Sequence, residues 1–360
     1  MGCILMLIIR QEHRDPPIEI DVGSEVYAVT FSANGEYLLS GGDGGVQVWQ
    51  VEDGTQVARM GAGYVSCLAV SKDGRWIATG TWMGETFVWD AKTHKQVFKN
   101  QKDSYTIKGV DFSPNSTRLL SASNNKTASI WDIPTRKRVQ TLRHDNFLTA
   151  AKYSPQGNRI ATATEYCIRV WDSKDGRLLL DIKVGVTPLF NTGLFWSNKL
   201  LFVISGSRIQ KIDACTGSVV SAWSVPDSDY RSCIALPKHG QSITYSANRF
   251  VTFWDTSSHT QLGRIQHPQD IRSTALSPDD EFIAIGGEEG EVIINSPSSI
   301  TVGVLFRSIV EYTGNSDLSA RRIRSLCLVY TQHSSNQSLR SMTPRSIHGG
   351  SISSRTQKHH

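Results

Sequence analysis

The sequence predicts an all-β protein built from seven copies of one small unit. A strand-like ending recurs at a nearly constant spacing, runs with the alternation of a β-strand lie between these endings, and no helical period occurs between Glu25 and Asn295. The chain has 360 residues, of which 39% are hydrophobic and 20% charged. Such a composition is typical of a globular protein with enough apolar side chains for a large core.

The recurrent ending first occurs as GGVQVWQVEDG at residues 44–54. One anchor residue closes the ending in each unit: Trp49, Trp89, Trp131, Trp171, Ile212, Trp254 and Ile294. Successive anchors are 40, 42, 40, 41, 42 and 40 residues apart. Seven units at so regular a period indicate a repeat architecture rather than two or three separate domains.

Each unit contains four short strands in the same order. The first alternates apolar and polar residues and ends in a Ser-like residue, as in VYAVTFS (26–32). A tight turn such as Asn34-Gly35 leads to a second strand, YLLSGG (37–42), and a short loop leads to the third strand, which ends at the anchor. A turn such as Asp53-Gly54 then opens a more polar fourth strand. Since one such sheet cannot bury both faces, the seven sheets are expected to close into a seven-bladed β-propeller of four-stranded antiparallel blades.

The details of the repeat resemble the WD-repeat β-propeller family. Trp-Asp pairs begin at Trp89, Trp131, Trp171 and Trp254, and Ser-Pro turns occur at Ser113-Pro114, Ser154-Pro155 and Ser277-Pro278. The resemblance covers about residues 18–306 and implies a ring-shaped scaffold for other proteins, without selecting a partner.

The departures from the family pattern concern its polar network. In the family, a His before the first strand and an Asp before the third are joined through Ser or Thr to the Trp. Here the His occurs only as His144 and His267, and the Asp only as Asp43. The resemblance implies structural roles for these residues, and blades five to seven are expected to depend more on apolar packing.

Ring closure is left open among three segments by the sequence. Three segments could supply the outermost strand of the last blade: Ile4–Ile9, Ile18–Ile20 and Ile300–Phe306. The segment IEI at 18–20 is favoured, because it lies as far before the first strand of unit one as the fourth strands of other units lie before the next first strand. We therefore expect an N-terminal segment at 1–17, a propeller at 18–307 and a disordered Ser/Arg-rich tail at 308–360.

The positive charge of the chain is concentrated at its C-terminal end. Residues 296–360 contain eight Lys or Arg against two Asp or Glu, a net charge of +6, so the overall charge of +5 leaves −1 for the first 295 residues. Binding of nucleic acid or an acidic surface is therefore expected only through the tail, around Arg321, Arg322 and Arg324.

Nothing in the sequence predicts an enzyme, a cofactor or a metal site. No phosphate-binding loop, nucleophile elbow or metal-ligand spacing occurs, and the six cysteines are scattered without a Cys-x-x-Cys pair. That spacing is typical of reduced thiols in a cytoplasmic or nuclear protein. The apolar run Cys3–Ile9 is too short to span a membrane, and we expect the chain to be monomeric on its own.

The leading prediction is a non-catalytic scaffold that binds other proteins or peptides through loops on one face, the narrow face. The loops that enter the first strands carry several aromatic residues, with polar residues two positions further along, which is the usual composition of a binding hot spot. The predicted partner-binding residues are Tyr27, Tyr64, Trp82, Lys108, Phe147, Phe190, Tyr230 and Arg272.

Overall fold

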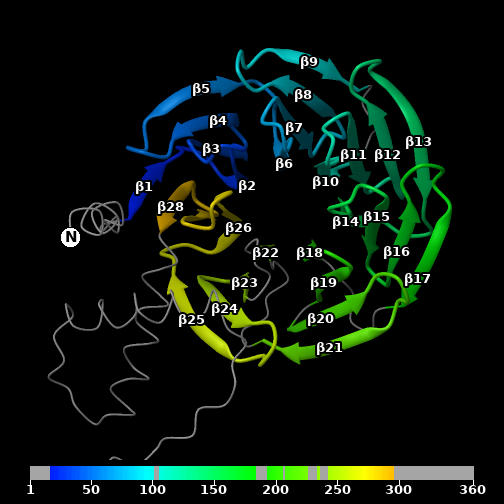
Figure 1. Ribbon diagram of the computed structural model, residues 1–360. Coiled ribbons are helices and arrows are strands. Elements are labelled where there is room, and N and C mark those ends of the chain that lie inside the picture. The colour runs from blue at the N-terminus through cyan, green and yellow to red at the C-terminus, as the bar shows by residue number, and fades with distance from the viewer. Residues whose placement is uncertain are drawn as a thin grey trace, which may run out of the picture. The chain divides into compact units, whose positions relative to one another are not determined.

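In the computed structural model, the described residues form seven four-stranded antiparallel sheets arranged in a ring (Figure 1). The structure describes residues 17–100, 105–183, 193–205, 207–225, 233–235 and 242–295. These residues all belong to one compact unit, Met1–Val304, and contain strands and turns but no helix. The seven-bladed, all-β prediction is confirmed, and the tail expected at 308–360 lies outside the described residues.

The first four blades follow the chain without interruption. Blade one consists of β2 (Val26–Phe31), β3 (Tyr37–Gly42), β4 (Gly45–Gln50) and β5 (Gln56–Met60). Blade two consists of β6 (Val65–Val70), β7 (Trp76–Thr81), β8 (Thr86–Asp90) and β9 (Gln96–Lys99). Blade three consists of β10 (Ile107–Phe112), β11 (Arg118–Ser123), β12 (Thr127–Asp132) and β13 (Lys137–Arg143). Blade four consists of β14 (Leu148–Tyr153), β15 (Arg159–Thr164), β16 (Cys167–Asp172) and β17 (Leu178–Lys183).

The last three blades complete the ring. Blade five consists of β18 (Gly193–Ser197), β19 (Leu200–Ser205), β20 (Arg208–Asp213) and β21 (Val219–Ser224). Blade six consists of β22 (Cys233–Ala235), β23 (Ser242–Ala247), β24 (Phe250–Asp255) and β25 (Gln261–Gln266). Blade seven consists of β26 (Ile271–Leu276), β27 (Ile283–Gly287), β28 (Glu291–Asn295) and, from the other end of the unit, β1 (Ile18–Asp21).

The ring is closed by β1, the segment that the sequence favoured. It pairs antiparallel with β28 in the register Ile18 to Ile294 and Ile20 to Val292. Ile20 is buried in an apolar cluster that joins blades seven and one. The two rival segments, Ile4–Ile9 and Ile300–Phe306, lie outside the described residues. Pairing of the first strand with the last leaves no open sheet between the two ends of the ring.

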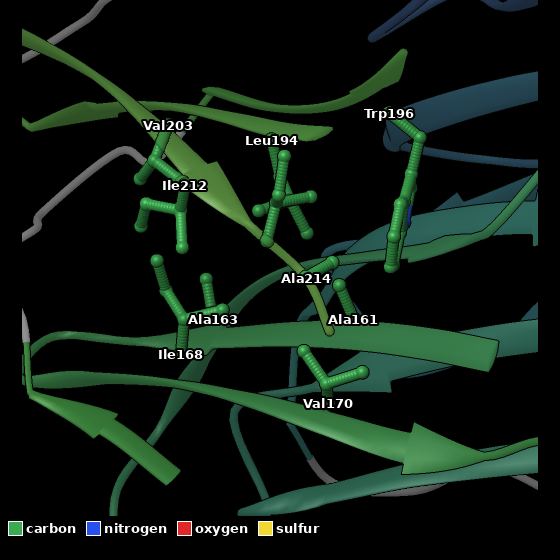
Figure 2. Packing of buried hydrophobic residues seen from close by; sticks show 10 residues of the cluster. Ala161, Ala163, Ile168, Val170, Leu194, Trp196, Val203, Ile212 and Ala214 are labelled. Carbon is green, nitrogen blue, oxygen red and sulfur yellow. The ribbon is translucent and has the colours of Figure 1, made fainter. Parts of the chain in front are cut away.

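The hydrophobic core lies between the blades. Seven clusters of buried apolar side chains each join two neighbouring blades. Figure 2 shows the one between blades four and five, where Ile168 and Val170 of β16 face Leu194, Val203 and Ile212 of the next blade. Each sheet therefore depends on its neighbours for the burial of both faces.

Small residues near the axis let neighbouring blades approach each other. The first strands contact one another in the cyclic order β2, β6, β10, β14, β18, β22, β26 and back to β2. A Cβ atom added at Gly41 would lie 2.6 Å from the side chain of Val65, and one added at Gly80 would lie 2.5 Å from that of Ile107. Larger residues at these two positions would push blade one from blade two, and blade two from blade three.

The anchors lie at the ends of the third strands, as the sequence predicts. In blades one to six, the pairing between the third and the outermost strand skips one residue of the outermost strand just before the anchor, as in a β-bulge. In the first four blades, the indole Nε1 of the anchor donates a hydrogen bond to a hydroxyl on the second strand: Trp49 to Ser40, Trp89 to Thr79, Trp131 to Ser121 and Trp171 to Thr162. In blade six, Trp254 instead donates to Thr252 of its own strand.

The anchors of blades five and seven are isoleucines, which have no donor for a hydrogen bond to the second strand and are buried among apolar side chains. Ile212 and Ile294 are both buried in the clusters that join their blades to a neighbour. Blades five and seven thus depend on apolar packing at the anchor, in agreement with the sequence, whereas blade six retains an indole hydrogen bond.

Candidate functional site

The narrow face is the face that carries the loops entering each first strand and the turns between second and third strands. The other turns, between first and second and between third and fourth strands, lie on the opposite face because the strands alternate in direction. Most of the sequence-predicted partner-binding residues therefore fall on one face. Two of them, Phe190 and Tyr230, lie outside the described residues.

Exposed apolar side chains are unevenly distributed over the ring. In the part of the chain that the structure describes, eleven large apolar side chains are exposed. Five lie on the outermost strands: Val57, Val139, Leu178, Val219 and Val220. Six lie on the narrow face, in the loops of blades two to four: Tyr64, Trp82, Met83, Tyr105, Phe147 and Tyr166. The turns of the opposite face contain none of the eleven.

Three predicted residues are thus exposed aromatics, as expected. Tyr64, Trp82 and Phe147 are 50%, 45% and 46% exposed. Tyr105 and Met83 have similar exposure but were missed by the sequence reasoning, which counted a single position in each incoming loop and added only Trp82 from the turns. A scan of every aromatic residue in both kinds of narrow-face loop would have found Tyr105 and Tyr166.

The backbone of Trp82, in the turn between β7 and β8, is held by two neighbouring loops. Its N–H donates a 3.0 Å hydrogen bond to the carbonyl of Tyr64, in the loop that enters blade two. Its carbonyl accepts a 3.2 Å hydrogen bond from Oγ1 of Thr106, in the loop that enters blade three. The indole ring is therefore presented from a fixed backbone while its side chain stays about half exposed.

Four predicted residues from four successive blades form a cation–aromatic ladder, Lys108–Trp82–Tyr27–Arg272. The ammonium of Lys108 lies 5.2 Å from the centre of the Trp82 ring. The rings of Trp82 and Tyr27 meet edge to face with centroids 5.5 Å apart, and the guanidinium of Arg272 lies 5.9 Å from the Tyr27 ring. Arg272 also forms an ion pair with Glu288. These contacts are within the range at which aromatic rings attract cations and each other.

The polar groups of the ladder differ in whether a carboxylate lies next to them: Tyr27 and Arg272 each have one, and Lys108 has none among the described residues. The hydroxyl of Tyr27 donates to the carboxylate of Glu25, and this hydrogen bond raises the pKa of Tyr27 well above its ordinary value. Arg272 is compensated by Glu288. At the other end, burial lowers the pKa of Lys108, because the half-buried ammonium is partly removed from water.

Phe147 belongs to a second group, between blades three and four, and the structure does not join it to the ladder. The ammonium of Lys126 lies 5.7 Å from its ring. Nearby, Arg169 forms ion pairs of 2.8 Å with Asp145 and 3.0 Å with Asp181. The narrow face thus carries two polar and aromatic groups rather than one continuous ring of equivalent sites.

The two family-type histidines are buried rather than exposed to a ligand. His144 is buried edge to face against Trp171, with centroids 5.2 Å apart, and burial lowers its pKa to about 4. His267 is fully buried, its Nδ1 accepts a 3.1 Å hydrogen bond from the N–H of Gln269, and burial lowers its pKa. Both therefore occupy structural positions, as the sequence predicts.

The opposite face contains a polar hollow of about 670 Å³ between blades three and four. Its walls include Asn115, Arg118, Asp132 and Tyr153. Arg118 donates a 3.3 Å hydrogen bond to the carbonyl of Ser173, and the carboxylate of Asp132 is occupied by hydrogen bonds from Thr135. The guanidinium and the carboxylate balance each other, so the hollow presents no net charge.

Within the described residues, no group of three or more His, Cys, Asp or Glu is arranged to hold a metal ion, and no helix long and apolar enough to cross a membrane occurs.

Comparison with known proteins agrees with the repeat pattern. The family model of the WD domain, G-beta repeat, matches residues 20–50, 54–90, 92–132 and 136–172. These segments contain the third strands of the four blades whose anchor Trp donates to a hydroxyl of the neighbouring strand. The family model therefore matches the four blades in which the anchor indole donates to the second strand.

The relatives that align over most of the chain are distant in sequence. The chain is 23% identical over 228 residues to a U3 small nucleolar RNA-associated protein 15 homolog of Xenopus laevis. This alignment covers 62% of this chain and 44% of that protein. It is 21% identical over 291 residues to a guanine nucleotide-binding protein subunit beta of Schizosaccharomyces pombe, covering 68% of this chain and 95% of that one. The chain thus spans less than half the length of the first relative.

A solved structure shares the fold. A chain in the structure titled "Crystal Structure of Mitotic Checkpoint Complex" superposes with a TM-score of 0.70 over 79% of this chain and 93% of that chain. At 17% sequence identity, this similarity shows the fold alone.

Proposed function

Because the chain folds as a seven-bladed propeller and four of its repeats match the WD domain, G-beta repeat, we propose that it is a WD-repeat protein that acts as a non-catalytic scaffold and binds partner proteins or peptides through the narrow face. Propellers of this family generally serve as interaction scaffolds, which supports the proposal. We also propose that the chain is monomeric on its own. We further propose that it acts in the cytoplasm or the nucleus; the name of one relative, which refers to a small nucleolar RNA, is consistent with the nucleus.

The observation that carries the proposal is that, among the described residues, six of the eleven exposed large apolar side chains lie on the narrow-face loops. Exposed aromatic side chains bury much area on binding and have few rotamers to lose, so they often dominate interface energies. Trp82 is the strongest single candidate, because its backbone is already held by two loops and its ring is flanked by Lys108 and Tyr27.

Serine substitutions on the narrow face test this proposal. Tyr64→Ser, Trp82→Ser and Phe147→Ser are each compared with Val139→Ser, a matched control because Val139 is 50% exposed on the outermost strand β13. Partners captured from the native extract by the unaltered protein are identified, and their affinities are then measured with each purified variant. We expect at least one narrow-face variant to lose about 2 kcal/mol, or roughly 30-fold in Kd, while Val139→Ser changes little.

The control for folding is the circular dichroism spectrum and melting temperature of each variant. Binding that survives all three narrow-face substitutions in folded variants would move the interface to the blade edges or to the hollow on the opposite face. Arg118→Ala would then distinguish these two surfaces, because Arg118 lines the hollow.

The second candidate is binding of nucleic acid or an acidic surface through the basic tail. The observation that favours it is the net charge of +6 over residues 296–360, which lie outside the described residues, against −1 for the rest. Contacts with phosphate groups weaken steeply as salt rises, whereas an aromatic protein interface responds much less. The dependence of binding on ionic strength therefore separates the two candidates.

A further inference from the structure

In blades one to four and in blade seven, the second residue of the first strand is polar or carries a polar group, and these residues differ in their hydrogen-bond and ion-pair partners. They are Tyr27, Ser66, Lys108, Thr149 and Arg272. Ser66 and Thr149 donate their hydroxyl protons to backbone carbonyls of their own or the neighbouring blade. Tyr27 donates to Glu25, and Arg272 pairs with Glu288. Each of these four groups is therefore already occupied within the fold.

Lys108 is the exception among the described members of this set. Its ammonium has no hydrogen bond or ion pair with any described residue, although it is half buried and lies over the Trp82 ring at 5.2 Å. Burial lowers its pKa, since no carboxylate offsets the loss of water. A partly desolvated cation without a counter-ion leaves free energy available to an anion that docks beside it.

We propose that Lys108 receives the carboxylate of a Glu or Asp side chain on the docked peptide, next to an apolar side chain that packs on Trp82 and Tyr64. This inference rests on the proposed binding function of the narrow face. Trp82 and Tyr64 are about half exposed and are joined by a backbone hydrogen bond, so the apolar and the cationic parts of the site are adjacent. The partner is thus a peptide segment in which an acidic residue lies close to an aromatic or aliphatic one.

The charges around the ladder favour a carboxylate over a phosphate. A phosphate group carries close to two negative charges and is usually held by clustered guanidinium groups. Here a single ammonium is available, because the other cation of the ladder, Arg272, is paired with Glu288. Glu25 and Asp43 also place negative charge around the neighbouring Tyr27, which opposes a dianion more than a monoanion.

A random 12-residue peptide display library tests the inference on the full chain. Selection is run in parallel against the unaltered protein, Lys108→Met and Trp82→Ser, after each is shown to keep its circular dichroism spectrum and melting temperature. We expect peptides selected by the unaltered protein to be enriched in Glu or Asp beside an apolar residue. The acidic enrichment should disappear with Lys108→Met, and Lys108→Gln serves as a second variant if the first is unstable.

The strongest selected peptide is then measured in a double-mutant cycle. Its acidic residue is changed to the matching amide, and both peptides are titrated against the unaltered protein and Lys108→Met. We expect the amide to weaken binding about tenfold for the unaltered protein and less than twofold for Lys108→Met. An equal loss for both proteins, the absence of acidic enrichment, or a stronger preference for a phosphoserine version of the peptide would overturn the inference.

These outcomes differ from failure of the proposed function. Peptides that lose binding with Trp82→Ser but show no acidic preference would leave the narrow face as the interface and remove only the role of Lys108. Peptides that bind Trp82→Ser and Tyr64→Ser as tightly as the unaltered protein, or no selection above background, would contradict both.

Discussion

The indole Nε1 of Trp171 donates a 2.8 Å hydrogen bond to Oγ1 of Thr162 on the adjacent strand. Trp171 pairs with Ile160, two residues before Thr162. In blade five the corresponding anchor is Ile212, which pairs with Leu201, two residues before Val203. Indole and hydroxyl are therefore both replaced by apolar groups at this position of blade five, so that the exchange leaves no unpaired donor at the anchor itself.

Thr162→Val should therefore destabilise the ring more than its small change of shape suggests. The variant leaves the Trp171 indole N–H without its acceptor and also removes the bond from Thr162 to the carbonyl of Arg169. We expect the free energy of unfolding to fall by about 1 to 3 kcal/mol in denaturant titration. Thr162→Ser is the matched control, since serine occupies the equivalent place in blades one and three. Equal losses for the two variants would show that the hydrogen bond contributes little.

Removal of β1 should open the ring. Because β1 supplies the outermost strand of blade seven, a fragment of residues 22–307 leaves the outer edge of β28 unpaired and exposes the apolar cluster that Ile20 covers. We expect this fragment to melt at a clearly lower temperature than the full chain, as measured by calorimetry. The same melting temperature for both would contradict the role of β1 in closure.

A point substitution gives a finer measure of the same closure. Ile20→Ala should lower the free energy of unfolding by about 2 to 4 kcal/mol, because it leaves a cavity between blades seven and one. Glu19→Ala is the control: Glu19 is the exposed neighbour on the same strand, and a change within about 0.5 kcal/mol is expected.

Buried histidines should make the ring sensitive to mild acid. The pKa of His144 falls to about 4 in the folded protein, from an ordinary value of 6.5, because burial disfavours the imidazolium. Since the unfolded chain takes up a proton first, the free energy of unfolding falls as pH drops from 6.5 towards 4, by up to about 3 kcal/mol. Burial also lowers the pKa of His267, which adds to the loss in the same direction.

Denaturant titrations across this range measure the effect. His144→Phe retains an aromatic edge against Trp171 and should show a smaller loss of stability between pH 6.5 and 4 than the unaltered protein. Below pH 4 both proteins should lose stability alike, because hydrogen-bonded carboxylates with lowered pKa values, such as Asp255 at about 2, become protonated. An unchanged slope in His144→Phe would show that His144 is not the group responsible.

The tail should contribute to polyanion binding rather than to stability. Deletion of residues 308–360 removes most of the concentrated positive charge, so retention on heparin should fall while the melting temperature stays nearly unchanged. Elution of both proteins is compared in the same salt gradient. Retention that survives the deletion would place the polyanion site on the ring.

The fold could be predicted almost completely from the sequence. A period of 40 to 42 residues, with Trp or Ile closing each third strand, depends on local strand and turn preferences that act within one unit. The closing strand at 18–20 could be chosen for the same reason, because its offset from the first strand matches that of the fourth strands in other units. The family resemblance also implied structural rather than catalytic roles for His144 and His267, and both side chains are buried.

The candidate site was decided only in part by the sequence. Counting along the repeat placed aromatic residues on one face, but it missed Met83, Tyr105 and Tyr166, because loop residues do not follow the strand period. Counting along the repeat also could not show that Phe147 lies apart from the ladder. Its ring contacts Lys126, and such a contact depends on the positions of side chains in the folded ring.

The ladder itself is a product of the tertiary structure. Tyr27, Trp82, Lys108 and Arg272 come from four blades, and Tyr27 and Arg272 are neighbours only because the ring closes. Local sequence determines that each residue stands near the narrow end of its blade. The ion pair of Arg272 with Glu288 forms within blade seven, between residues 16 apart in the chain. Only the packing of blade against blade decides that Lys108 of blade three lies over the Trp82 ring of blade two and that Arg272 lies beside Tyr27 of blade one, because these contacts depend on distances between side chains of different blades.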